Sequence, residues 1–247
     1  MAGRAGERGE GRRPARGVAP DDARLHRAHA YQRARACLAG LIAILLVAAC
    51  GAVRAPSRNA QQEDNFDDDV RASRVLSEEF WKQQFEASGG TYQPIRDFIP
   101  YSGDRGPSCG GQPSVPNNAF YCPDGHFVAY DQAWLEALWS EMGDGSTWLI
   151  IPHEIGHAVQ AQLENRFQYS IQIELQADCY AGATLAALVK SGAITAEEND
   201  DKELLLNLAA AGDPTEDWFN PQAHGTAEQR QQSFARGYRG GVGACQP

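Results

Sequence analysis

The chain has 247 residues, of which 43% are hydrophobic and 22% are charged, so it is long enough for one well-buried domain and too apolar for wholesale disorder. Its formal net charge of −10 is unevenly distributed: residues 1–49 carry nine arginines against four acidic residues, a net of +5, whereas residues 50–247 carry 13 basic against 28 acidic residues, a net of −15. An acidic main body would repel phosphates, which argues against nucleic acid as a partner.

The basic head is followed by an uncharged apolar run, Ala36 to Val53. A basic region, an apolar run and small residues at its end fit a secretory signal peptide. The sequence VAAC, residues 47–50, resembles a bacterial lipobox, in which the cysteine is acylated. The run is also at the lower limit of length for an uncleaved membrane-spanning helix. Both alternatives place the body outside the cytoplasm, anchored to the bacterial cell membrane through lipidated Cys50 or through an N-terminal helix.

We therefore divide the chain into a signal peptide with a lipobox (1–49), an acidic flexible tether (50–69) and a domain (70–247). The first half of the domain is predicted to contain, in chain order: a helix that begins after Asp69 and ends at Gly89–Gly90, an extended edge segment Tyr92–Tyr101, a loop 102–118, a strand His126–Asp131 and a helix 132–142 that ends at Gly143.

The second half is predicted to be helical. One helix carries His153 and either begins at Pro152 or is kinked there, and a second begins at about Ser170. A third helix is expected to begin at the capping pair Thr195 and Glu198 and to end at Gly212. The last helix is expected at or after HGTAEQR, where Thr226 and Gln229 could cap its start. The sequence thus predicts an α+β fold, mostly helical, with a small β element before the helix of His153.

The six cysteines agree with export to an oxidising compartment. Two of them, Cys37 and Cys50, lie in or at the end of the signal peptide. The other four lie in the domain and allow three pairings: Cys109, Cys122, Cys179 and Cys245. We favour Cys109–Cys122, which would close a Gly/Pro-rich loop, and Cys179–Cys245 then follows by elimination. The alternative is free buried thiols, which behave as small hydrophobic side chains.

The sequence HEIGH, residues 153–157, has the spacing of a metal helix. Residues four apart lie on one face of a helix, so His153 and His157 can bind a single zinc ion. Glu154 lies next to the first histidine and could act as general base toward a water molecule at the metal without being a ligand. Gly156 is small enough to let another segment approach closely.

A catalytic zinc site needs a third protein ligand and an open fourth position. Glu174 follows His157 by 17 residues, enough to finish one helix, turn and begin an antiparallel one. Asp178 lies one turn further on the same face, so we expect Glu174 to bind zinc and Asp178 to accept a hydrogen bond from a ligand histidine. Acidic helix residues are usually solvated, but apolar neighbours surround these two, and a buried carboxylate needs a partner.

Four motifs together resemble those of the bacterial neutral zinc metallopeptidase family, whose members are membrane-anchored and gluzincin-like: FYCPDGH, HEIGHAVQ, ELQADCYAG and HGTAEQRQQSFARGY. The resemblance covers residues 70–245. It implies a compact gluzincin-like core, with His153, His157 and Glu174 as ligands of one zinc ion and Glu154 as catalytic base. The chain departs from the family pattern at Pro152 and at His126, which we expect to be exposed and without function.

The oxyanion formed during peptide hydrolysis needs a further donor. His224 is one candidate, because a nearby helix N-terminus favours neutral imidazole; the alternative is a structural turn histidine. Tyr180 is a second candidate. The predicted function is a membrane-anchored zinc metallopeptidase that cleaves peptides or envelope proteins. The alternative is a catalytically weak lipoprotein in which zinc stabilises an interaction module of the cell envelope, but such a site has no use for an unligated Glu154.

Overall fold

A computed structural model describes residues 65–246. The predicted signal peptide, the lipidation site Cys50 and the tether up to residue 64 lie outside the described residues. Within the described residues no helix is both long and apolar enough to cross a membrane.

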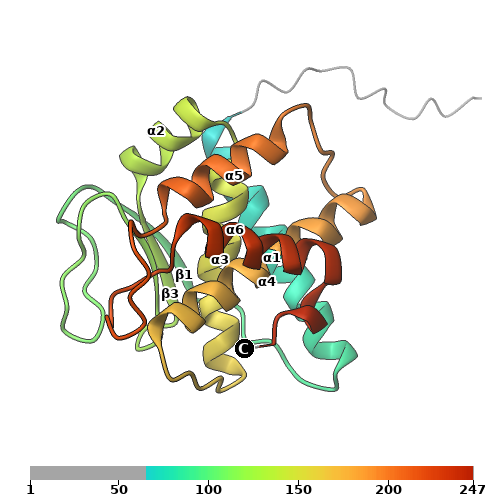
Figure 1. Cartoon of the computed structure of the whole chain (residues 1–247), viewed down its shortest axis with the longest axis horizontal. Helices are drawn as coiled ribbons and strands as arrows, with labels where there is room; N and C mark the ends of the chain where they lie inside the picture. The colour runs from blue at the N-terminus through green and yellow to red at the C-terminus, as the bar shows by residue number, and fades with distance from the viewer. Residues whose placement is uncertain (1–64, 247) are drawn as a thin grey trace, which may run out of the picture. The chain divides into compact units, whose positions relative to one another are not determined.

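The described chain is α+β, as predicted, and contains six α-helices, a small sheet and a final 3-10 turn (Figure 1). In chain order the elements are α1 (Phe66–Ala87), β1 (Asp97–Tyr101), β2 (Ala119–Cys122), β3 (Phe127–Asp131), α2 (Gln132–Met142), α3 (Gly145–Gln162), α4 (Ser170–Ser191), α5 (Asp200–Ala210), α6 (Ala227–Gly240) and η1 (Val242–Ala244).

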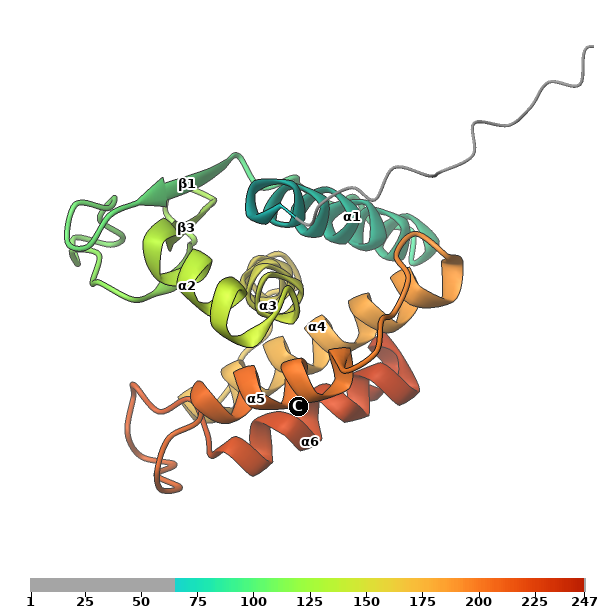
Figure 2. The same ribbon diagram turned by 90° about the horizontal axis from the view of Figure 1, so that it is seen from above.

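Helix α3 lies at the centre of the helical layers. Figure 2 shows α3 almost end-on, with α1 on one side of it and α4 on the other, and with α6 beyond α4; α5 packs on α3 and α6. Its side chains Ile151, Ile155 and Val159 are completely buried and belong to one hydrophobic cluster with residues of α1, β3 and α4. A helix that is covered on several faces can hold polar side chains rigidly, because its neighbours leave little room for other rotamers.

The sheet has the strand order β1-β3-β2, so β3 is central and both other strands are edges. Strand β1 is parallel to β3, whereas β2 is antiparallel to it. The edge position expected for the segment around Pro100 is therefore confirmed, although only its second half is a strand. Strand β2 was not predicted: it is four residues long, too short for a period-two pattern to be recognised.

Several helix boundaries differ from those predicted. Helix α1 begins at Phe66, four residues before Val70, because the Asn65 side chain accepts a hydrogen bond from the amide of Asp67 and three aspartates favour the first turn. Helix α3 begins at Gly145 and runs through Pro152, so it does not start at the proline. The proline lacks an amide hydrogen and leaves the carbonyl four residues earlier without its helical partner.

The prediction that Thr195 and Glu198 form a capping box at a helix start is wrong. Helix α5 begins at Asp200, after Asn199 in the left-handed conformation, and it ends at Ala210, before Gly212. The second expected pair is confirmed: Thr226 and Gln229 form a capping box at the start of α6, inside rather than after the HGTAEQR motif.

Both favoured disulfides are present in the structure, Cys109–Cys122 and Cys179–Cys245. The second ties the end of the described chain to α4. The same region brings α4 and α6 into close contact, because a Cβ atom on Gly237 would lie 1.8 Å from the carbonyl oxygen of Cys179. Helix α6 thus packs closely on α4, and the segment that follows α6 is bonded covalently to α4 through the disulfide.

Candidate metal centre

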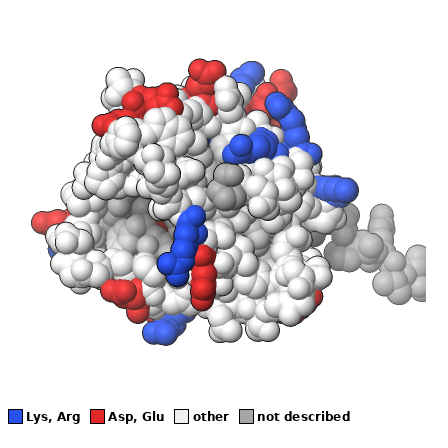
Figure 3. All heavy atoms as spheres, turned by 60° about the horizontal axis from the view of Figure 1, so that its bottom comes forward, with Lys and Arg blue, Asp and Glu red and all other residues white. Residues whose placement is uncertain are grey.

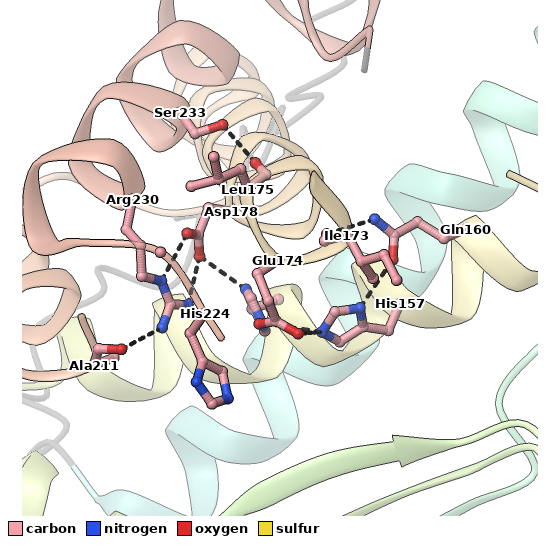
Figure 4. Close-up of polar contacts among 12 residues, drawn as sticks. His157, Gln160, Ile173, Glu174, Leu175, Asp178, Ala211, His224, Arg230 and Ser233 are labelled. Atoms are coloured by element: carbon pink, nitrogen blue, oxygen red, sulfur yellow. Dashed lines mark hydrogen bonds and ion pairs between the residues drawn. The ribbon is translucent and has the colours of Figure 1, made fainter. Parts of the chain in front are cut away.

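Two buried helices bring together the three residues predicted to bind metal. Helix α3 supplies His153 and His157, one turn apart, and α4 supplies Glu174. The Nε2 atoms of the two histidines are 3.1 Å apart. The carboxylate oxygens of Glu174 lie 3.3 Å from Nε2 of His153 and 3.5 Å from Nε2 of His157. Figure 4 shows Glu174 between the ring of His157 and the side chain of Asp178.

These separations fit a zinc ion. Donor atoms bound tetrahedrally at about 2.1 Å from one ion are roughly 3.4 Å from each other, and all three donors here lie within 4.8 Å of one another. Two imidazoles and one carboxylate are also a donor set that catalytic zinc takes in proteins. The group could therefore hold a metal ion without rearrangement of the helices.

Asp178 lies behind the cluster, with its side chain completely buried. Its Oδ1 atom is 2.9 Å from Nδ1 of His153. The guanidinium of Arg230, on α6, donates to both carboxylate oxygens, and a third donor of Arg230 reaches the carbonyl of Ala211 at 2.9 Å. The Nδ1 atom of His153 is thus bonded to Asp178, which leaves Nε2 directed at Glu174 and His157.

The charged side chains of this cluster shift one another's pKa values. Burial alone would raise the pKa of Asp178, but Arg230 and His153 outweigh it, and the pKa is lowered. Burial would lower the pKa of His153, but its hydrogen bonds to Asp178 and Glu174 raise it to about 10. Burial would also raise the pKa of Glu174, but His157 and His153 outweigh it, and the pKa is lowered. Both carboxyl groups are therefore ionised at neutral pH, and a metal ion at Nε2 of His153 would compete with a proton.

Glu154 lies on α3 beside the cluster and is 6% exposed. Its Oε2 atom is buried and has no hydrogen-bond partner among the described residues. A buried carboxylate oxygen without a partner is costly, so its presence marks a position where another molecule is expected to bind. Glu154 faces the same cleft as His153, His157 and Glu174.

The cleft has a volume of about 930 Å³. Helices α2 and α3 provide an apolar wall, strand β2 provides one rim and the loop between α3 and α4 provides another; representative lining residues are Trp134, Leu138, Ile150, Phe120, Tyr121 and Phe167. The face drawn in Figure 3 is hollowed, with basic and acidic side chains scattered over it rather than gathered in one patch.

His224 lines this cleft, although its side chain is 54% exposed. Its backbone amide donates to Asp213 at 2.6 Å, and its ring Nδ1 lies 3.6 Å from the other oxygen of that carboxylate. Tyr180 is buried, accepts a hydrogen bond from Asn165 and packs on Trp81 outside the cleft lining. His126 is only partly buried and bonds Tyr121 and the carbonyl of Gln93.

Two residues of the site were not predicted, Arg230 and Gln160. Arg230 lies within the HGTAEQR motif, in which the local pattern indicates only the caps of the helix. A buried Asp178 requires a cationic or hydrogen-bonding partner, and this requirement could have pointed to Arg230. Gln160 lies three residues after His157, on the same helix face, and its Oε1 atom is 2.9 Å from Nδ1 of His157.

Comparison with known proteins gives a family and relatives. Residues 47–246 match the family described as "Putative neutral zinc metallopeptidase". The Escherichia coli (strain K12) protein "Uncharacterized protein YpfJ" is 30% identical over 233 residues, which cover 83% of this chain and 77% of that protein. The Mycobacterium tuberculosis (strain ATCC 25618 / H37Rv) protein "Uncharacterized protein Rv2575" is 32% identical over 170 residues, 57% of this chain and 58% of that protein.

No solved structure matches the chain. The family match spans most of the sequence, including every residue of the cluster described above, and the Escherichia coli relative aligns over most of both proteins. The chain therefore belongs to the neutral zinc metallopeptidase family.

Proposed function

We propose that this protein is a membrane-anchored zinc metallopeptidase that hydrolyses peptide bonds. The observation that carries the proposal is the position of Glu154: a buried carboxylate oxygen without a partner faces the cleft beside three side chains that could hold a metal ion. A site that served only to stabilise the fold would not need this carboxylate, because structural zinc sites have no open position.

In this proposal His153, His157 and Glu174 hold one zinc ion. When bound, zinc supplies Lewis acidity, which lowers the pKa of water and polarises a carbonyl oxygen. Glu154 accepts a proton from the attacking water at Oε2 and returns it to the leaving amine. Asp178 and Arg230 hold His153 in one orientation throughout. His224, on the rim of the cleft, donates a hydrogen bond to the developing oxyanion.

Strand β2 offers a way to orient the substrate. The amide of Asp131 donates to the carbonyl of Asn118 at 2.8 Å. Because bonded and non-bonded pairs alternate in an antiparallel ladder, the backbone groups of Ala119 and Tyr121 face away from β3. Both residues line the cleft. An extended peptide could therefore pair with this edge, which favours peptide or protein substrates over small molecules.

The proposed location is the outer side of the bacterial cell membrane. Support comes from the basic and apolar N-terminal sequence that ends in VAAC and from the two disulfides, which form and persist in oxidising compartments. Lipidation of Cys50 would leave the domain tethered by residues 50–64.

The test compares the full chain, purified in detergent, with Glu154→Gln. We expect the wild type to cleave members of a peptide library in a chelator-sensitive way, and the variant to lose about 10²- to 10⁴-fold of that activity while it retains zinc. Glu136→Gln, on the exposed face of α2 and outside the cleft lining, is the matched control and should remain active. Zinc binding by the wild type without cleavage of any peptide would instead favour the interaction module.

A further inference from the structure

The two histidines of the metal site are oriented by different kinds of partner. His153 bonds the carboxylate of Asp178, which can only accept a hydrogen bond. His157 bonds the side-chain amide of Gln160 at 2.9 Å. An amide can present either its oxygen or its NH₂ group to a ring nitrogen. The tautomer of His157 therefore depends on which way Gln160 faces.

Two backbone carbonyls determine that orientation. The Nε2 atom of Gln160 is 2.7 Å from the carbonyl oxygen of Ile173, and Nε2 of Gln176 is 2.8 Å from the carbonyl oxygen of Cys245. Since a carbonyl oxygen only accepts, both amides must turn their NH₂ groups toward these atoms.

The second amide then supports the first. With its NH₂ group on Cys245, Gln176 presents Oε1 to the NH₂ group of Gln160 at 3.1 Å and to that of Asn165 at 2.8 Å. Gln160 must therefore present its own Oε1 atom to His157. The ring nitrogen Nδ1 of His157 can only donate to that oxygen.

Burial makes this arrangement rigid. Gln160 is 5% exposed, Gln176 is 4% exposed and Cys245 is 1% exposed, so water has little access to compete for these groups. The carbonyl of Cys245 is also held in place covalently, because the Cys245 side chain is disulfide-bonded to Cys179 on α4. We call the chain of hydrogen bonds from Cys245 through Gln176 and Gln160 to His157 the amide relay.

We propose that Gln160 and Gln176 are positioning residues that fix His157 as its Nδ1–H tautomer and so leave the Nε2 lone pair free for a metal ion. The proposal rests on the metal site of the proposed function. The uncharged amide relay, anchored on backbone carbonyls, orients the ring of His157, just as the charged carboxylate of Asp178 orients the ring of His153.

The experiment uses the full chain with Gln160→Met and Gln176→Met, which remove the amides at similar side-chain length. The matched control is Gln162→Met: Gln162 is on the same helix and also makes two hydrogen bonds, both to the backbone of Gln93. Zinc affinity is measured by competition with a chromophoric chelator. We expect about 10- to 100-fold weaker binding for Gln160→Met, a smaller loss for Gln176→Met, because Ile173 still orients Gln160, and no loss for Gln162→Met.

A second variant separates positioning from packing. Gln160→Glu places a carboxylate against the carbonyl of Ile173, so it should destabilise the fold, yet it still accepts a hydrogen bond from His157. We expect this variant to bind zinc more tightly than Gln160→Met even though its thermal midpoint is lower. A purely structural role for Gln160 would make zinc affinity follow stability instead.

Nitrogen-15 chemical shifts of the His157 ring in metal-free protein give a readout that needs neither zinc nor activity. We expect a protonated Nδ1 and an unprotonated Nε2 in the wild type, and loss of this preference in Gln160→Met. If Nε2 carries the proton in the wild type, or if Gln160→Met changes neither the tautomer nor zinc affinity, the proposal is wrong. Failure of the wild type to bind zinc would reject the proposed function, while the shifts would still decide the role of the relay.

Discussion

Arg230 donates to both carboxylate oxygens of Asp178, each at 2.8 Å. This bidentate pair joins α6 to α4 behind the metal site, and neither side chain has appreciable access to solvent. Asp178 is also hydrogen-bonded to His153. The ion pair between α4 and α6 is therefore connected by a single hydrogen bond to a proposed metal ligand.

The first prediction concerns this pair. Replacing Arg230 with methionine leaves a carboxylate buried without its cation, and breaking such a pair costs about 3–5 kcal/mol. We therefore expect Arg230→Met to lower the free energy of unfolding by that amount in urea denaturation. Arg236→Met is the control, since Arg236 is exposed on the same helix and bonds Ser233; it should change the free energy of unfolding by less than about 1 kcal/mol. Equal effects of the two substitutions would mean that the pair contributes nothing specific.

The second prediction concerns metal removal. A ligand that binds only the folded state stabilises it, by about 4 kcal/mol at a concentration 1,000 times the dissociation constant. A chelator should therefore lower the thermal midpoint of the zinc-loaded protein without unfolding it at room temperature, because the hydrophobic core and both disulfides remain.

Glu174→Gln should remove most of this zinc-dependent shift, since a carboxylate donor of the cluster is lost. Glu136→Gln should keep it. Scanning calorimetry with and without zinc measures both variants, and a full shift in Glu174→Gln would exclude Glu174 as a ligand.

The third prediction concerns His224. If its ring donates to the oxyanion, His224→Ala should lower kcat by about 10²- to 10³-fold, with zinc affinity unchanged. His224→Gln retains an N–H donor and should recover part of the loss. Single-turnover hydrolysis of a cleaved library peptide measures the effect. Turnover equal to that of the wild type would assign His224 to the alternative, a structural turn held by Asp213.

The fourth prediction concerns the N-terminus. Cys50→Ser should abolish incorporation of a labelled fatty acid and release the domain from the membrane fraction of the host bacterium. Cys37→Ser, in the same apolar run, is the control and should leave labelling intact. A chain that stays in the membrane fraction after Cys50→Ser, with its signal segment uncleaved, would support the anchor helix in place of the lipoprotein.

The sequence predicts those parts of the site that depend on helical periodicity. His153 and His157 lie on one face because they are four residues apart, and the start of α4 at Ser170 and the extent of α2 follow from local sequence. The α+β class and the two disulfides could also be predicted. All of these features require only short-range rules or a small number of possible pairings.

The ion pair and the amide relay behind the metal site, which were missed, depend on tertiary contacts. The pair Asp178–Arg230 joins residues 52 positions apart, and no local pattern relates them. The amide relay ends on the carbonyl of Cys245, and the backbone groups that it uses have no signature in the sequence. The local capping pattern at Thr195 does not take account of the packing of Ile194 against the cluster around Leu204 and Leu208. It also does not anticipate the left-handed Asn199 that precedes α5.

Gly156 stands between the two histidines of α3 and contributes no functional group. A Cβ atom at this position would lie 3.2 Å from Cα and 3.3 Å from the carbonyl oxygen of Ala177, on α4. Those contacts are tighter than ordinary van der Waals distance, so a methyl group would push α4, and Glu174 with it, away from the histidines. The single hydrogen atom at position 156 therefore limits how closely α3 and α4 approach, and with it the distance between Glu174 and the two histidines. Substitution there would change the spacing of the three donor side chains while leaving each of them in the chain.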